Sequence, residues 1–272
     1  MFFQQFIRVD NGMLGTIAAL LLSVSALAYP MRQFAVGANL SPAPVSNTYY
    51  QGEVVKLSPL IYLRLGESSG TTAVDAMGFE DGEYIFGPTL GTPGLITSNA
   101  DTAVTFNGMF QWTTIPHSPP VSSTTFTVVI WANPTLSGFS AMAAKYDNPG
   151  TCGGGFGCGW TFRIDPGGTV TLVSYAPVSG YTVVSSTGSY GGAKHCFALR
   201  VGNGCASIYI DGVLDGAGPI EDIATTASPL TVGAQDGVPS SPFNGILDEF
   251  SYWTEDIGAS AILNLYTVGS TP

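Results

Sequence analysis

Short apolar runs separated by turn residues dominate the chain from about Ser58 to its end. No long stretch carries the 3.6-residue period of an amphipathic helix, and no segment repeats at a fixed spacing. The 35 glycines and 18 prolines among 272 residues supply the turns. Short strands with regular turn signals predict an all-β sandwich.

The clearest hairpin runs from His195 to Asp211 around the turn Asn203-Gly204, the dipeptide that type I′ turns prefer. This turn predicts three cross-strand pairs with one apolar face, namely Val201 with Ala206, Leu199 with Ile208 and Phe197 with Ile210. A shift of one residue would destroy the match. Cys205 would then lie about 20 Å from Cys196, at ~3.3 Å per residue, which is too far for a disulfide.

Other strands are predicted over residues 60–65, 103–106, 126–131, 160–164 and 170–174. The run 126–131 is apolar on both faces, so it should lie inside a covered sheet. Near the end, Ile262, Leu265 and Tyr266 share one face of a short helix. We expect Gly269 to stop that helix.

An uncharged segment lies near the N-terminus, between Asp10 and Arg32. Its apolar centre, residues 17–24, is shorter than the ~20 residues that a membrane-spanning helix needs. Residues 26–28, Ala-Leu-Ala, match the pattern of a signal-peptide cleavage site. The segment therefore fits an apolar arm that packs against other proteins, a cleavable secretion signal or a membrane anchor.

Three regions follow from these features. We expect residues 1–37 to form the arm, or the signal or anchor, and residues 1–40 to contact other subunits of an assembly. Residues 38–57, which contain two prolines, should be a linker. The sandwich should span 58–272.

The charge pattern excludes one class of partner. The chain has 8 basic and 19 acidic residues, a formal net charge of −11, and its cations are scattered singly. Sequence-independent nucleic-acid binding needs clustered Lys and Arg to neutralise phosphates. We therefore expect no nucleic acid as a partner; a weakly charged acidic chain suits an extracellular protein or an assembly subunit.

Two cysteines bracket a glycine-rich loop, Cys152 and Cys158. The spacing does not fit the paired C-x2–4-C ligands of structural zinc sites. In an oxidising compartment the two would form a disulfide; otherwise both are free cysteines in glycine-rich turns.

Several segments resemble those of a known family, and they occur in that family's order. They are LRLGESSGTTAVD (63–75), FTVVIW (126–131), KHCFAL (194–199) before YIDG (209–212), FNGILDEF (243–250) and the closing Leu265-Tyr266. Together they resemble the concanavalin A-like, laminin-G-type domain over about residues 50–270. The resemblance implies a two-sheet antiparallel jelly-roll sandwich that binds glycans, peptides or cell-surface proteins, often with calcium at its rim.

The resemblance does not extend to an active site. Glycosidases on this fold carry two carboxylates on one strand, spaced Glu-x-Asp-x-x-Glu or Glu-x-Asp-x-Glu, and this chain has neither pattern. Asp248 and Glu249 are adjacent, so alternation should place them on opposite faces. His117 and His195 are the two histidines, and no Ser or Cys lies in a G-x-S-x-G setting. We therefore expect no enzymatic activity.

Two kinds of binding site remain. Glu67 and Asp75 bracket a Ser-Ser-Gly turn, and the implied fold brings Asp248 near them, which predicts a calcium site because calcium prefers carboxylates and turn carbonyls. The alternative is that Asp248 accepts hydrogen bonds from loop amides while Glu249 is exposed. For a glycan, aromatic side chains near loops are the candidates: Trp112, Tyr146 and Trp160, with Phe156 and Tyr181 as further ones, although tryptophans in a sandwich, Trp131 above all, are often core.

These observations favour a non-enzymatic structural or adhesive protein of a surface assembly. The form that we expect is a tailed-phage virion component, attached through its N-terminal arm, whose laminin-G-like domain faces outward and binds host glycans or proteins. The alternative is a secreted or membrane-anchored bacterial lectin-like protein on the cell surface.

Overall fold

The computed structural model describes residues 49–97, 99–148, 157–176, 180–221, 223–237 and 240–271. The chain divides into two units, Met1–Pro44 and Val45–Pro272, and the described residues all belong to the second. The predicted arm, signal or anchor lies outside them. Among the described helices, none combines the length and apolar character that a membrane crossing requires.

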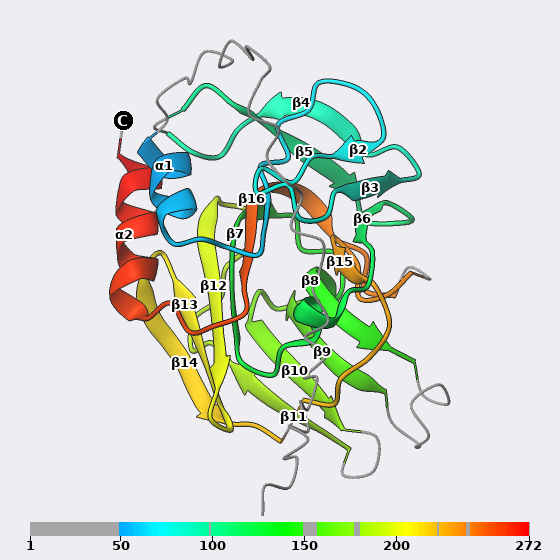
Figure 1. Ribbon diagram of the computed structural model, residues 1–272, viewed down its shortest axis with the longest axis vertical. Helices are drawn as coiled ribbons and strands as arrows, with labels where there is room; N and C mark the ends of the chain where they lie inside the picture. Colours follow the sequence, from blue (N-terminus) through cyan, green and yellow to red (C-terminus); the bar gives the residue numbers. More distant parts are fainter. Residues whose placement is uncertain are drawn as a thin grey trace, which may run out of the picture. The chain divides into compact units, whose positions relative to one another are not determined.

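The described residues form two antiparallel sheets (Figure 1). Sheet A has the order β14-β13-β12-β7-β16-β5-β4, with β1 also paired to β16. Its strands are β1 (Ile61–Leu63), β4 (Thr89–Pro93), β5 (Thr102–Asn107), β7 (Phe126–Pro134), β12 (His195–Gly202), β13 (Cys205–Ile210), β14 (Val213–Pro219) and β16 (Asn244–Trp253).

Sheet B has the order β11-β10-β9-β8-β15-β6-β3-β2. Its strands are β2 (Thr72–Ala73), β3 (Gly82–Ile85), β6 (Trp112–Ile115), β8 (Ser140–Asp147), β9 (Cys158–Ile164), β10 (Val170–Ala176), β11 (Gly180–Ser185) and β15 (Leu230–Val232). A short 3₁₀ helix, η1 (Pro119–Ser122), precedes β7. The predicted jelly-roll sandwich is confirmed.

The main core lies between the two sheets. Alternate residues of each strand face it, so that Phe197 and Leu199 of β12 meet Phe162 of β9 and Leu172 of β10 in one buried cluster. The predicted register of the β12–β13 hairpin is confirmed at all three pairs. Asn203 has φ 52° and its neighbour Gly204 φ 70°, as a type I′ turn requires. Cys196 and Cys205 are both free.

A second core covers the outer face of sheet A. Helices α1 (Tyr49–Lys56) and α2 (Ala259–Ser270) lie side by side (Figure 1) and bury Tyr50 and Leu265 against Trp131 of β7. The expected linker 38–57 therefore ends in a packed helix. The predicted C-terminal helix is confirmed, but it does not stop at Gly269, where a Cβ would meet Trp131 Cζ2 at 2.5 Å.

Gly159 is a position where the sandwich has no room for a side chain. It has φ +97°, and a Cβ there would lie 1.8 Å from the carbonyl oxygen of Lys145 on the neighbouring strand β8. We predict that Gly159→Ala lowers the free energy of unfolding by about 2–5 kcal/mol, because it combines backbone strain with overpacking. Gly167→Ala, at a turn with nothing within 4 Å, should change it by less than ~0.5 kcal/mol. Urea denaturation measures both, and equal effects would contradict the prediction.

Candidate functional site

The outer face of sheet B holds three rows of side chains that run across β8, β9, β10 and β11. Cross-strand pairing sets them as Ala141-Arg163-Thr171-Ser185, then Ala144-Thr161-Val173-Val183, then Tyr146-Gly159-Tyr175-Tyr181. The residues between them along β9 and β10, such as Phe162 and Leu172, face the main core. This face therefore has small and aliphatic residues in its middle row, with Arg163 on one side and tyrosines on the other.

The third row is an aromatic ladder formed by Tyr146, Tyr175 and Tyr181. The ring centroids of Tyr146 and Tyr175 are 4.6 Å apart, and those of Tyr175 and Tyr181 are 6.3 Å apart. Tyr146 and Tyr175 lie two strands apart, and their rings meet because Gly159 stands between them without a side chain. Exposure to solvent increases along the ladder, from 8% for Tyr146 to 60% for Tyr181.

A first hollow, of about 250 Å³, lies between the aromatic ladder and Arg163. Its lining residues are Phe139, Arg163, Val173, Tyr175, Tyr181 and Val183. The Arg163 Cζ atom lies 4.3 Å from the centroid of the Phe139 ring, a cation–π contact. This hollow offers apolar and aromatic surfaces together with one cation.

A second hollow, of about 120 Å³, lies beside Tyr146 and includes Asp147, Asn148 and Asp236. Asn148 Nδ2 donates to Asp236 Oδ2 at 3.1 Å. Between the two hollows, Gln235 Nε2 contacts the Tyr175 hydroxyl at 3.4 Å. Hydrogen-bonding groups thus flank the ladder on this side.

The three aromatic residues predicted to bind a ligand lie in different parts of the structure. Tyr146 is part of the ladder. Trp160 faces the main core, where it stacks on Phe126 with ring centroids 4.8 Å apart, so it cannot be a platform for a sugar. Trp112 is buried in β6, which β15 separates from β8, and it meets the exposed Phe86 edge-on. Phe156 lies outside the described residues.

The three carboxylates predicted to bind calcium already accept hydrogen bonds from the protein. Asp75 accepts from the backbone N–H groups of Tyr62, Met77, Phe79 and Glu80, while Glu67 accepts from Val74 N–H and the Tyr84 hydroxyl. Asp248 accepts from Leu95 N–H at 2.7 Å. Within the described ranges, no group of three or more His, Cys, Asp or Glu residues could hold a metal ion. Glu67, Asp75 and Asp248 thus each organise a neighbouring loop, and calcium binding stays a prediction.

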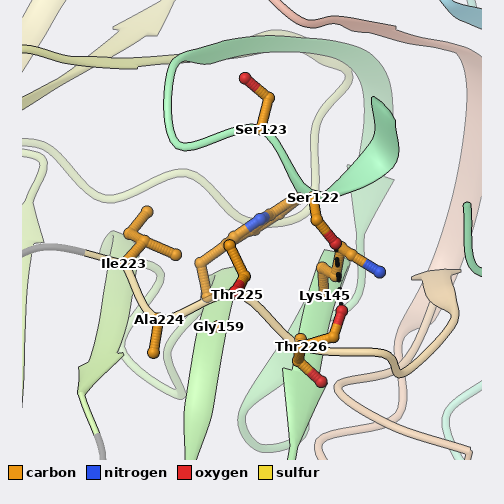
Figure 2. A pocket seen from close by; sticks show the side chains of 9 residues that line it. Ser122, Ser123, Lys145, Gly159, Ile223, Ala224, Thr225 and Thr226 are labelled. Atoms are coloured by element: carbon orange, nitrogen blue, oxygen red, sulfur yellow. Dashed lines mark hydrogen bonds between the residues drawn. The ribbon is translucent and has the colours of Figure 1, made fainter. Parts of the chain in front are cut away.

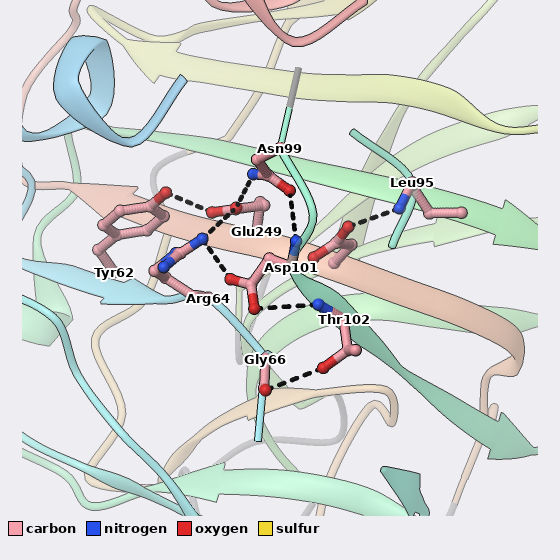
Figure 3. A network of polar contacts seen from close by, with 9 residues as sticks. Tyr62, Arg64, Gly66, Leu95, Asn99, Asp101, Thr102 and Glu249 are labelled. Atoms are coloured by element: carbon pink, nitrogen blue, oxygen red, sulfur yellow. Dashed lines mark hydrogen bonds and ion pairs between the residues drawn. The ribbon is translucent and has the colours of Figure 1, made fainter. Parts of the chain in front are cut away.

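Asp248 and Glu249 do not lie on opposite faces of β16, as alternation predicted. The pairing of β16 with β7 shifts between Asp248 and Ser251, and Glu249 has φ 52°, as in a β-bulge. Leu247 and Phe250 both join the main core, so two residues instead of one stand between them. Both carboxylates therefore reach the segment 95–101 (Figure 3).

Glu249 is fully buried, not exposed, and belongs to a polar network (Figure 3). The Tyr62 hydroxyl donates to Glu249 Oε2, and Asn99 Nδ2 donates to Glu249 Oε1 at 3.2 Å. Arg64 pairs with Asp101 and lies 3.6 Å from Glu249 Oε1. The network ties β1 and β16 to the segment before β5, and its burial keeps Glu249 from a ligand.

Burial raises the pKa of both carboxyls in this pair. For Asp248 the loss of solvent is the largest cause, and the charge of Glu249 adds to it. Loss of solvent also raises the pKa of Glu249, to about 7, against the opposing influence of Arg64. The neutral forms are therefore favoured in the folded protein.

Lys145 is a buried lysine on the inner side of β8. Its ammonium donates to Ser228 O at 2.5 Å and contacts His117 Nδ1 at 3.2 Å. Burial lowers its pKa to about 8. Figure 2 shows the cavity beside it, where Ser122 Oγ donates to Thr226 O; at about 10 Å³, this cavity holds one water molecule at most. It is a packing defect rather than a ligand site.

Cys158 is buried at the start of β9. Cys152 lies outside the described residues, so the disulfide between them stays a prediction.

The two antiparallel sheets define a lectin-like jelly-roll domain. The family model of the concanavalin A-like lectin/glucanases superfamily matches residues 107–262. Since this is more than half of the chain, the protein belongs to that superfamily. No curated protein matches the chain.

Solved structures share the fold at low sequence identity. Domain 4 of AbnA, an extracellular arabinanase from Geobacillus stearothermophilus in complex with arabinotriose, is 19% identical with a TM-score of 0.59, over 76% of this chain and 98% of that domain. The binding domain of botulinum neurotoxin serotype D is 14% identical with a TM-score of 0.56, over 78% of this chain and 52% of that one.

The sialidase of Trypanosoma rangeli in complex with the inhibitor DANA is 14% identical with a TM-score of 0.56. The likeness covers 82% of this chain and 38% of the sialidase. The chain thus spans about half the toxin domain and less than half the sialidase. At these identities the likeness concerns the fold.

The buried pair predicts a pH dependence of stability. A carboxyl whose pKa rises on folding stabilises the protein below its unfolded pKa, and this stability is lost as the pH rises through the folded pKa. For Glu249 the window runs from 4.5 to about 7, and the loss should reach about 3–4 kcal/mol at ~1.4 kcal/mol per pKa unit. Urea unfolding at pH 4.5 and pH 8 measures it.

Two variants test the origin of this loss. Glu249→Gln should make the profile less steep, because the amide has no proton to lose and only Asp248 of the pair still titrates. Glu83→Gln, at an exposed position of β3, should leave it unchanged. A Glu249→Gln profile as steep as that of the unchanged protein would contradict the assignment.

Proposed function

We propose that this domain is a non-catalytic glycan-binding module whose ligand lies along the aromatic ladder and across the two hollows. The ladder is the observation that carries the proposal. A pyranose or furanose ring has an apolar face of C–H groups that packs on an aromatic ring, and hydroxyls at its edge that need hydrogen-bond partners. Tyr175 and Tyr181 offer the first surface, and the polar groups beside Tyr146 offer the second, the mixture typical of small-ligand sites.

The superfamily and two of the structural neighbours support this proposal. The arabinanase domain was solved with arabinotriose, and the toxin domain is a binding domain. Both are similar in fold to this chain rather than in the residues of a site, so the ligand of this chain has to be argued from its own ladder.

A non-catalytic role is supported by the position of the paired carboxylates. Glycoside hydrolysis needs two carboxyl groups that flank the scissile bond. Asp248 and Glu249 are adjacent but sealed under the segment 95–101, with exposed fractions of 1% and 0%. Since some neighbours carry this fold within whole enzymes, every glycan that binds should also be assayed for release of reducing sugar, and we expect none.

The wider setting that we propose is the surface of a virion, where the N-terminal segment attaches the domain to other subunits and the glycan face points outward to a host surface. A secreted or cell-surface lectin is the alternative. We expect native isolation to give an intact chain of 28.2 kDa within a large particle. A free monomer cleaved after residue 28 would overturn the virion setting and favour the lectin.

The glycan proposal predicts the effect of Tyr181→Ala. Loss of this ring should weaken glycan binding about 3- to 10-fold, because an aromatic contact contributes ~0.5–1.5 kcal/mol beyond the area it buries. Phe110→Ala is the matched control, since Phe110 is equally exposed, at 60%, but lies next to β6. A glycan array identifies the ligand, in buffer with calcium and in buffer with a chelator, and titration calorimetry compares the variants. An empty array, or equal losses for both variants, would overturn the proposal.

A further inference from the structure

The guanidinium of Arg163 lies between an aspartate and an aromatic ring. Its Nε donates to Asp165 Oδ1 at 3.1 Å, and Phe139 supports the face of the guanidinium. Within the described residues, its two terminal nitrogens donate no hydrogen bond to the protein. Arg200, by contrast, uses a terminal nitrogen on Asp256 and another on the Tyr209 hydroxyl.

The surroundings of Arg163 hold the guanidinium in one orientation. Asp165 fixes its Nε edge and also accepts a hydrogen bond from Thr171 Oγ1 at 3.3 Å. The Phe139 ring covers one of its faces. A guanidinium held in this way loses little conformational entropy when it binds a planar anion, and its terminal N–H groups match the two oxygens of a carboxylate.

Arg163 lines the first hollow. Its six described lining residues include one cation and no carboxylate, in a chain of net charge −11. The positive charge of Arg163 lowers the pKa of Tyr175 against the larger, opposing effect of burial. The field of the guanidinium therefore reaches the aromatic ladder across the floor formed by Val173.

The second hollow is lined by carboxylates rather than by a cation. It contains Asp147 and Asp236 with Asn148, so it favours hydroxyl donors and disfavours anions. A ligand that lies along the ladder would meet a cation at one end and carboxylates at the other.

Resting on the glycan-binding function proposed above, we propose that the first hollow selects a sugar acid, a ring that carries a carboxylate, with Arg163 as the residue that determines specificity. The ring packs on Tyr175 and Tyr181, its carboxylate accepts hydrogen bonds from the terminal nitrogens of Arg163, and a neutral sugar next in the chain extends toward Asp236. The order of the two sugars is thereby fixed.

The test compares pairs of probes that differ in the carboxylate. 3′-Sialyllactose, in which one acidic sugar precedes two neutral sugars, is titrated against its carboxyl-reduced counterpart. Methyl galacturonide is titrated against methyl galactoside, which has the same ring without the carboxylate. We expect the full chain to bind at least one acid about tenfold or more tightly than its neutral partner, since hydrogen bonds to charged groups are the strong ones. The preference should shrink between 50 and 500 mM NaCl because salt screens the contact.

Variants assign the preference to Arg163. Arg163→Gln should reduce the affinity for the acid to that for the neutral sugar, while Arg163→Lys should keep part of the preference. Arg200→Gln is the matched control, because Arg200 is also half-buried beside an aspartate but lies on sheet A, and it should change nothing. If Arg163→Gln does not fold, the preference of the unchanged protein and its salt dependence decide.

The outcomes separate the two proposals. Equal binding of acid and neutral probes, with a loss on Tyr181→Ala, would overturn the acid preference and leave glycan binding intact. A preference that survives Arg163→Gln would also overturn the assignment. If neither these probes nor the array give binding, both proposals fail.

Discussion

The two-residue alternation of side chains along β8, β9 and β10 is the constraint on which both the core and the candidate site depend. Phe162 and Leu172 face the core between the two sheets. Because successive side chains alternate between the two faces, Arg163 and Val173 face outward. A register shift of one residue would exchange the two sets. The stability of the sandwich therefore holds the ladder and the hollow in place, without any separate scaffold for the site.

Gly159 serves both the packing of the sheet and the continuity of the aromatic ladder. Its missing side chain lets the backbones of β8 and β9 approach closely, and it also lets the rings of Tyr146 and Tyr175 touch across the intervening strand. A residue with a Cβ would separate the strands and divide the ladder at the same time. Packing in the sheet and continuity of the aromatic surface are thus one requirement at this position, and a loss of binding in Gly159 variants has to be interpreted together with their stability.

The sequence predicted what local patterns determine. The Asn203-Gly204 turn and the apolar faces beside it specified the β12–β13 register, and the family segments specified the sandwich. Tyr175 and Arg163 were not predicted as site residues, although alternation places both on the outer face. The predicted strand 170–174 stops before Tyr175, and the glycan-binding candidates were aromatic residues near loops. Trp160 was chosen for its residue type, yet its place in the alternation puts it in the core.

The bulge in β16 lay beyond such reasoning, since an extra residue in a strand leaves no clear mark in the sequence when its flanks are apolar. It brings Asp248 and Glu249 to one face, where their mutual repulsion and burial oppose ionisation, and Arg64 and Tyr62 offset part of that cost. The buried hydrogen-bond network of Glu249 here ties the sandwich to the segment before β5. The charged group on the outer face of sheet B differs from this buried network in its partners. Arg163 lines a hollow, and its terminal nitrogens are left for a ligand rather than for the protein.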